Sequence, residues 1–251
     1  MTLARAVRAE STKLLTLPLF LYTAAGTVLL SIGFSWITTA LVASALAAGK
    51  PEETGGLDAG SAFLTILHFG QIGVILLGAW TVHQELDSGS LRSTLIAVPQ
   101  RSAVFAAKAL VVSGGVLLTA IPSVVGSTAV RCVAVDCSTE VARIAPDVLL
   151  GVVLYWILIA LFTYALSVIL RSGLAAMSAV LALALIVSTY LLPITPAAKF
   201  LPDQAGAQLY QQPPVPVDAL GPVGGGLVLL AWVAAAMGGA VVLFIRQPVR
   251  S

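Results

Sequence analysis

Long apolar stretches separated by short polar segments run through the whole chain. Six stretches of at least about 22 residues contain no charged side chain, and they do not alternate between apolar and polar positions. About 20 apolar helical residues cross the hydrocarbon core of a bilayer, which is roughly 30 Å thick. The pattern therefore predicts six transmembrane helices built on these stretches, at 19–46, 62–82, 104–130, 148–170, 174–192 and 224–245.

The composition agrees with this pattern and excludes a soluble protein. The chain is 59% apolar and 10% charged, with a mean hydropathy of +1.02, whereas soluble domains are about 25% charged. The first apolar stretch is longer than the core of a cleaved secretory signal, so we expect it to be retained. We predict an all-α membrane protein with a single six-span domain over residues 1–251.

The basic residues predict the orientation in the membrane. With six spans, both termini lie on the same side as the segment 83–108 and the turn at Arg171. These parts hold nine basic and three acidic residues, whereas the opposite loops hold four basic and eight acidic residues. Lys and Arg collect on the cytoplasmic side of short loops. We therefore expect a protein of the cell membrane, plasma or inner, with both termini in the cytoplasm.

The two cysteines, Cys132 and Cys137, then fall in the outer loop after the third span. An oxidising compartment permits a disulfide between them. Their spacing alone does not establish the geometry of a bond, so two independent thiols remain an alternative.

Two segments outside the spans, and one part of the last span, have recognisable patterns. Residues 1–18 predict an interfacial amphipathic helix that ends at Pro18, because apolar residues alternate in a helical period with charged ones. Seven prolines between 193 and 222 rule out a continuous helix there and leave room for short re-entrant or surface helices. In the last span, Ala231, Ala235 and Gly239 recur every four residues, which either allows close helix approach or reflects ordinary alanine content.

Several kinds of chemistry have no motif in this sequence. No phosphate-binding loop of the Gly-x-x-x-x-Gly-Lys-Ser/Thr type occurs, and no His-Glu-x-x-His zinc motif occurs. We predict no catalytic residue, no metal site and no cofactor on this chain. His68 and Gln71 form the one polar pair in the middle of a span. They serve either an interhelical hydrogen bond or a proton or substrate role.

Residues 83–103 form a charged cytoplasmic segment that spanning does not explain. Its centre, 90–98, predicts a short helix with Leu91, Leu95 and Val98 on one face, and Pro99 ends it. A helix of this size, about 14 Å long, either docks in a groove of another protein or rests on the membrane surface.

The order of these parts resembles the membrane subunits of ABC-2 type transporters. The likeness covers nearly the whole chain, and its motifs are loose. It is carried by the interfacial helix, the six spans, the broken outer segment, the basic C-terminal end and a cytoplasmic run made of Glu85, Gly89, Arg92, Pro99, Arg101 and Lys108.

The resemblance implies a permease subunit for export, such as multidrug efflux, of a drug, antibiotic or lipid-like amphiphile. Two copies of this chain would pair as a homodimer with two ATP-binding subunits, which carry the ATP and Mg; membrane lipid is expected as a further partner, and nucleic acid is not. The coupling segment would comprise Glu85, Asp87, Gly89, Leu91, Arg92, Leu95, Pro99 and Arg101. The supporting interfacial helix would carry Arg5, Arg8, Glu10 and Lys13.

Two other functions fit the same pattern. A membrane anchor, or an immunity protein that acts by sequestration, would use the cytoplasmic segment for docking without ATP hydrolysis. An ion-coupled secondary carrier is disfavoured, because such carriers place charged side chains inside the membrane.

Overall fold

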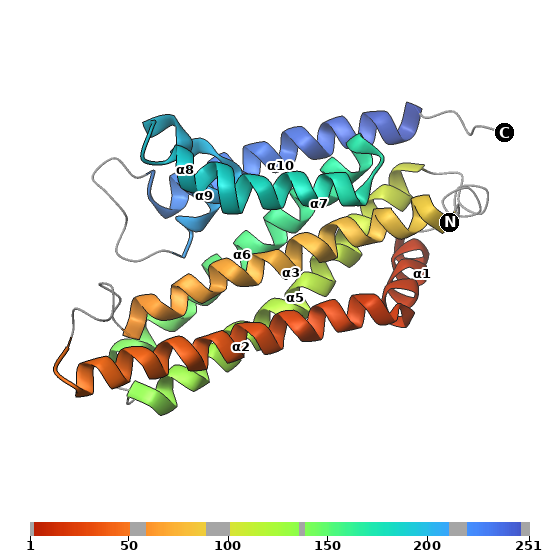
Figure 1. Cartoon of the computed structure of the whole chain (residues 1–251). Helices are drawn as coiled ribbons and strands as arrows, with labels where there is room; N and C mark the ends of the chain where they lie inside the picture. The colour runs from red at the N-terminus through yellow and green to blue at the C-terminus, as the bar shows by residue number, and fades with distance from the viewer. Residues whose placement is uncertain (1–2, 51–58, 89–100, 136–138, 211–219, 247–251) are drawn as a thin grey trace.

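The computed structural model describes residues 3–50, 59–88, 101–135, 139–210 and 220–246, and all regular structure in these ranges is helical (Figure 1). The elements are α1 (Leu3–Thr16), α2 (Pro18–Ala47), α3 (Ala59–Ser88), α5 (Arg101–Val135), α6 (Thr139–Leu170), α7 (Gly173–Ala182), a π-helical turn (Leu183–Val187), α8 (Ser188–Leu191), a 3-10 helix (Pro196–Phe200), α9 (Pro202–Ala207) and α10 (Gly221–Arg246).

Five of the helical stretches are long and apolar enough to cross a membrane. They are Pro18–Ala45, Arg101–Val130, Leu149–Leu170, Gly173–Leu191 and Gly221–Arg246. The predicted all-helical class is thus confirmed, and the chain is a multi-pass membrane protein. The remaining predicted span, 62–82, falls within the 30-residue helix α3.

Helix α6 is the centre of the bundle. It packs against α3, α5, α7 and α10, while α2 lies outside it against α3 and α5. The largest fully buried side chains include Tyr155, Trp156, Ile159 and Tyr164, all from α6. By contrast, α2 and α10 expose many large apolar side chains. This exposure is expected of helices whose outer faces contact lipid rather than water.

Two breaks in the chain set the directions of neighbouring helices. Pro18 is the first residue of α2, where its missing N–H costs nothing, so the chain turns sharply between α1 and α2 (Figure 1). The turn from α6 to α7 uses Arg171 in the left-handed region, at φ 52°. Ser172 then accepts a hydrogen bond from the backbone N–H of Ala175 and caps α7.

The proline-rich stretch folds as short helices at the end of the bundle away from α1 (Figure 1). Pro196 and Pro202 stand at the first turns of the 3-10 helix and of α9, where proline is tolerated. Helix α9 packs against α6 and α10. Residues 211–219 of this stretch lie outside the described ranges.

Candidate functional site

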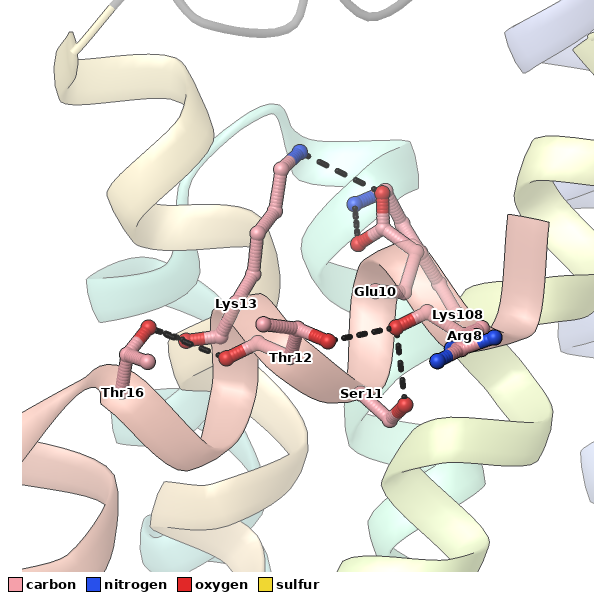
Figure 2. A network of polar contacts seen from close by, with 7 residues as sticks. All are labelled: Arg8, Glu10, Ser11, Thr12, Lys13, Thr16 and Lys108. Atoms are coloured by element: carbon pink, nitrogen blue, oxygen red, sulfur yellow. Dashed lines mark hydrogen bonds and ion pairs between the residues drawn. The ribbon is translucent and has the colours of Figure 1, made fainter. Parts of the chain in front are cut away.

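A buried ion pair joins α1 to α5 (Figure 2). Lys108 Nζ lies 2.6 Å from Glu10 Oε2, and Lys13 Nζ lies 3.3 Å from Glu10 Oε1. Lys108 is 4% exposed and Glu10 is 9% exposed, whereas Lys13 is exposed. A charge this far from water is tolerated when it is paired and hydrogen-bonded. Glu10 therefore fixes α1 at a defined place about two turns into α5.

The spacing of residues in α1 explains why Glu10 faces the protein. Ala6, Glu10 and Leu14 recur every four residues and form the buried stripe of this helix. Apolar contacts continue the junction along α5: a Cβ at Gly115 would come within 2.6 Å of the Phe20 ring and 3.4 Å of Leu14. Glycine at 115 lets both side chains lie against the helix backbone.

The other polar residues of α1 point away from this junction. Arg5 and Arg8 are exposed. Ser11 and Thr12 each donate a hydrogen bond to the carbonyl oxygen of Arg8, so their hydroxyls are satisfied within the helix (Figure 2). Leu3 and Leu15 are also exposed, at 45% and 55%. The side of α1 opposite the buried stripe thus presents Arg5, Arg8 and Leu15, whereas Leu3 is exposed at the start of the helix in line with the stripe.

A second contact joins the start of α5 to the end of α10. Arg101, the first residue of α5, donates a hydrogen bond from Nη1 to the carbonyl oxygen of Ile245 at 3.2 Å. This carbonyl belongs to the last turn of α10, where a cation is favoured by the helix dipole. The rings of Phe105 and Phe244 lie 5.8 Å apart just inside it. Helices α1, α5 and α10 are therefore connected at one end of the bundle.

Most of the predicted coupling segment lies outside the residues whose side chains are described. This applies to Glu85, Asp87, Gly89, Leu91, Arg92, Leu95 and Pro99. The described residues of the segment 83–103 lie at its two ends: His83, whose ring packs edge-on against Trp80 at 5.2 Å, and Gln84 belong to α3, and Arg101 begins α5. The two ends of the segment are thus helices held in the bundle, α3 and α5.

A buried polar cluster occupies the opposite end of the bundle. Asp203, at the start of α9, is fully buried; its Oδ1 accepts a hydrogen bond from Ser188 Oγ at 2.6 Å, and its Oδ2 accepts one from Gln204 Nε2 at 3.0 Å. Burial raises the pKa of Asp203, and the two hydrogen bonds oppose that rise. Burial also raises the pKa of Tyr210, and the negative charge of Asp203 adds to this effect.

Of the two polar residues predicted to pair in the second span, the structure describes the side chain of one. Gln71 is fully buried and accepts a hydrogen bond from the hydroxyl of Tyr155, which joins α3 to α6. An interhelical hydrogen bond is one of the two roles that the sequence left open. The side chain of His68 lies outside the described residues.

The predicted disulfide is described at one cysteine. Cys132, near the end of α5, is disulfide-bonded. Cys137 lies outside the described residues. Within the described part of the chain, no group of three His, Cys, Asp or Glu side chains is placed to hold a metal ion.

Two residues of these sites were not singled out for their contacts in the sequence. The sequence indicated Lys108 only as the last residue of the cytoplasmic run that begins at Glu85, yet Lys108 is the buried partner of Glu10. Asp203 counted only as an outer negative charge, yet it is fully buried. The sequence gives a weak indication that Asp203 is buried, because small and apolar residues surround it in Leu-Pro-Asp-Gln-Ala-Gly.

The carboxyl of Asp203 predicts a measurable dependence of stability on pH. A group whose pKa is raised in the native state stabilises the fold fully below its ordinary value of 3.8, and this contribution is lost as pH rises through the raised pKa. We expect the unfolding temperature of the wild type to fall from pH 4 to pH 8 relative to that of Asp203→Asn. Thermal unfolding in detergent across this range measures the difference.

Ser188→Ala provides the matched control for this experiment. It removes a hydrogen bond that favours the ionised carboxylate, so the loss of stability should extend to higher pH than in the wild type. Parallel pH curves for the wild type and Asp203→Asn would show that Asp203 does not titrate differently in the native state.

Comparisons with known proteins do not assign the chain to a family. No family model matches the sequence, and no curated protein matches it. The class of the protein therefore rests on its own helices: it is a multi-pass helical membrane protein with a fixed α1–α5 junction at one end and a buried carboxyl cluster at the other.

Proposed function

We propose that this chain is the permease subunit of an ATP-driven exporter of the ABC-2 type. In this proposal α3 also crosses the membrane, as the second span in chain order, and brings the number of spans to six. Helix α1 lies in the headgroup region on the cytoplasmic side, and residues 83–103 dock on a separate ATPase. The exposed arginines and leucines of α1 support an interfacial position, because arginine side chains can contact lipid headgroups while leucine side chains contact the acyl chains beneath them.

The observation that carries the proposal is the ion pair between Glu10 and Lys108. Helix α5 begins at Arg101, within the C-terminal end of the charged segment, and the pair attaches α1 to α5 about two turns further on. Arg101 attaches the same end of α5 to α10. A displacement of the segment is therefore passed to three helices together, which is what an energy-coupling element needs.

The partners follow from this arrangement. Two ATPase subunits, which carry ATP and Mg, would bind a homodimer of this chain, and the chain itself would have no catalytic residue. ATP-driven closure would favour one of two arrangements of the spans and thereby open an outward path for an amphiphilic drug, antibiotic or lipid-like substrate. Leu91 and Leu95 would fill the ATPase groove, and the nearby charges would set the register.

The coupling role is tested with the double variant Arg92→Glu/Leu95→Asp. The chain is purified in mild detergent together with its P-loop ATPase and reconstituted into vesicles, and substrate-stimulated ATP turnover is measured. We expect the double variant to reduce the stimulation at least about tenfold, because it places two charges in an apolar docking contact. The matched control is Lys50→Glu/Ile194→Asp, which likewise reverses one basic charge and replaces one aliphatic side chain by aspartate, at the other end of the bundle.

Each alternative function has its own outcome in this experiment. Unchanged stimulation in the double variant would show that the coupling site is wrongly placed. A stable preparation with no P-loop ATPase under ATP-trapping conditions would favour the anchor or immunity protein. Transport driven by an imposed ion gradient without ATP would favour a secondary carrier.

A further inference from the structure

A groove with a volume of about 470 Å³ runs along the outside of the bundle between α2 and α3. Its walls are almost entirely apolar or aromatic. Phe34 and Phe69 stack at one end, with ring centroids 6.2 Å apart, and the largely exposed ring of Tyr22 stands at the other. Tyr22 and Phe34 are twelve residues apart on one helix, so the groove is about 18 Å long. Its volume lies in the range of small-molecule sites, roughly 300–1,000 Å³.

Close packing of the two helices forms the floor of this groove. A Cβ at Gly73 would come within 1.8 Å of the Thr27 hydroxyl, and one at Gly70 within 2.4 Å of the Trp156 ring. Gly73 therefore allows α3 to contact α2 directly, and Gly70 leaves room for the Trp156 ring of α6 beneath the floor. At Gly26, by contrast, a Cβ would meet no atom within 4 Å. The groove is open at this position.

One of the three serine and threonine hydroxyls that line the groove differs from the other two. Thr23 and Thr27 donate to backbone carbonyls of their own helix, as serine and threonine usually do in apolar surroundings. Ser31 is 2% exposed and lines the groove, yet its Oγ has no hydrogen-bond partner among the described residues. The Oγ lies against Gly70, 3.1 Å from where a Cβ would stand.

The depth of Ser31 makes this unpaired hydroxyl informative. The span runs from Pro18 to Ala45, so Ser31 lies at its middle, about 20 Å from either end. Water and lipid headgroups do not reach the middle of the hydrocarbon core, and acyl chains offer no hydrogen bond. An unsatisfied hydroxyl there costs free energy that a polar group of a ligand would recover.

We propose that this groove binds a neutral amphiphile with an elongated apolar body and a hydrogen-bond acceptor partway along it. The body fills the space between Tyr22 and the Phe34–Phe69 pair, and the acceptor meets the Ser31 hydroxyl after one rotamer change of that side chain. A resident phospholipid fits less well, because its polar groups stay at the interface rather than at mid-depth. As a substrate site, the groove rests on the proposed function; as a binding site, it does not.

The test uses a photoreactive probe of this chemistry, 4-hexylbenzophenone, whose carbonyl is both the acceptor and the reactive group. The full chain is placed in phosphatidylcholine nanodiscs, labelled over a concentration series, and mapped by mass spectrometry. We expect saturable labelling of peptides that contain residues 22–34 and 69–76. Gly26→Leu should reduce it at least tenfold by filling the groove. Gly33→Leu is the control, because Gly33 is on the same helix with open space but does not line the groove.

The polar contact is tested separately. Ser31→Ala should raise the half-saturating probe concentration about fivefold, the loss of roughly one neutral hydrogen bond. Thr39→Val, which removes another buried unpartnered hydroxyl of α2 outside the groove, should change it less than about twofold. With a deuterated form of the probe, the competitor 4-hexyldiphenylmethane, which lacks the carbonyl, should compete more weakly than undeuterated 4-hexylbenzophenone on the wild type and equally on Ser31→Ala.

Three results would overturn the proposal. The first is labelling that does not saturate or that survives Gly26→Leu. The second is an unchanged half-saturating concentration in Ser31→Ala, which would mean that the groove binds apolar molecules without a polar contact at Ser31. The third is a stoichiometric phospholipid that co-purifies with the wild type and is lost in Gly26→Leu. None of these readouts needs ATP or an ATPase, so failure of the binding site and failure of the exporter proposal are distinguishable.

Discussion

Replacing Glu10 with alanine is expected to lower the free energy of unfolding by about 3 kcal/mol, the lower end of the range for breaking a buried ion pair. Glu10 is the carboxylate that both Lys108 and Lys13 contact, and Lys108 is almost completely buried. Without this carboxylate, the buried ammonium loses its shortest contact in surroundings where water cannot replace it. Unfolding in mixed micelles, followed by tryptophan fluorescence, measures the loss.

Two further variants separate the buried pair from general effects on α1. Lys13→Ala removes the exposed partner, so it should cost less than about 1 kcal/mol. The neutral pair Glu10→Gln/Lys108→Met should recover much of the loss, because neither member of the buried pair then carries a charge. If Glu10→Ala and Lys13→Ala had equal effects, the stability of the junction would come from surface electrostatics and not from the buried pair.

Hydropathy was sufficient to predict five of the six spans as long apolar helices, but not the contacts between helices. A span is defined by the solubility of a whole stretch in hydrocarbon, so about 20 residues contribute to the same signal. Glu10 and Asp203 show the limit of this signal. The first was assigned to the polar side of an interfacial helix and the second to an outer loop, yet both are buried against neighbouring helices. Burial of a single polar residue depends on the packing partner, which lies far away in the sequence.

Small residues illustrate the same limit. The pattern of Ala231, Ala235 and Gly239 in the last span left open either close helix approach or ordinary alanine content, and all three residues are exposed on α10. The close approaches of α10 occur instead at Gly225, where a Cβ would lie 2.3 Å from the carbonyl oxygen of Ala205. A four-residue spacing fixes which residues share a face. It does not fix which face meets another helix.

Gly78→Ala is expected to destabilise the bundle by about 3 kcal/mol, the upper end of the usual range for overpacking. Gly78 lies on α3 where it crosses α6, and an added Cβ would come within 2.4 Å of the carbonyl oxygen of Ala160. Side chains relieve such contacts by changing rotamer, but this contact is with the backbone of the central helix. The two helices must therefore move apart, and contacts along their whole crossing weaken.

The control for this prediction is Gly114→Ala on α5, where an added Cβ meets no atom within 4 Å. It should be neutral or stabilise by up to about 1 kcal/mol, because alanine has the higher helix propensity. The second-site variant Ala160→Gly tests the cause. The three atoms nearest to the new methyl all belong to the Ala160 backbone, so removing the Ala160 side chain should not restore stability to Gly78→Ala. Restoration would mean that α3 and α6 meet through side chains, and the backbone contact at this crossing would then not be what excludes alanine from position 78.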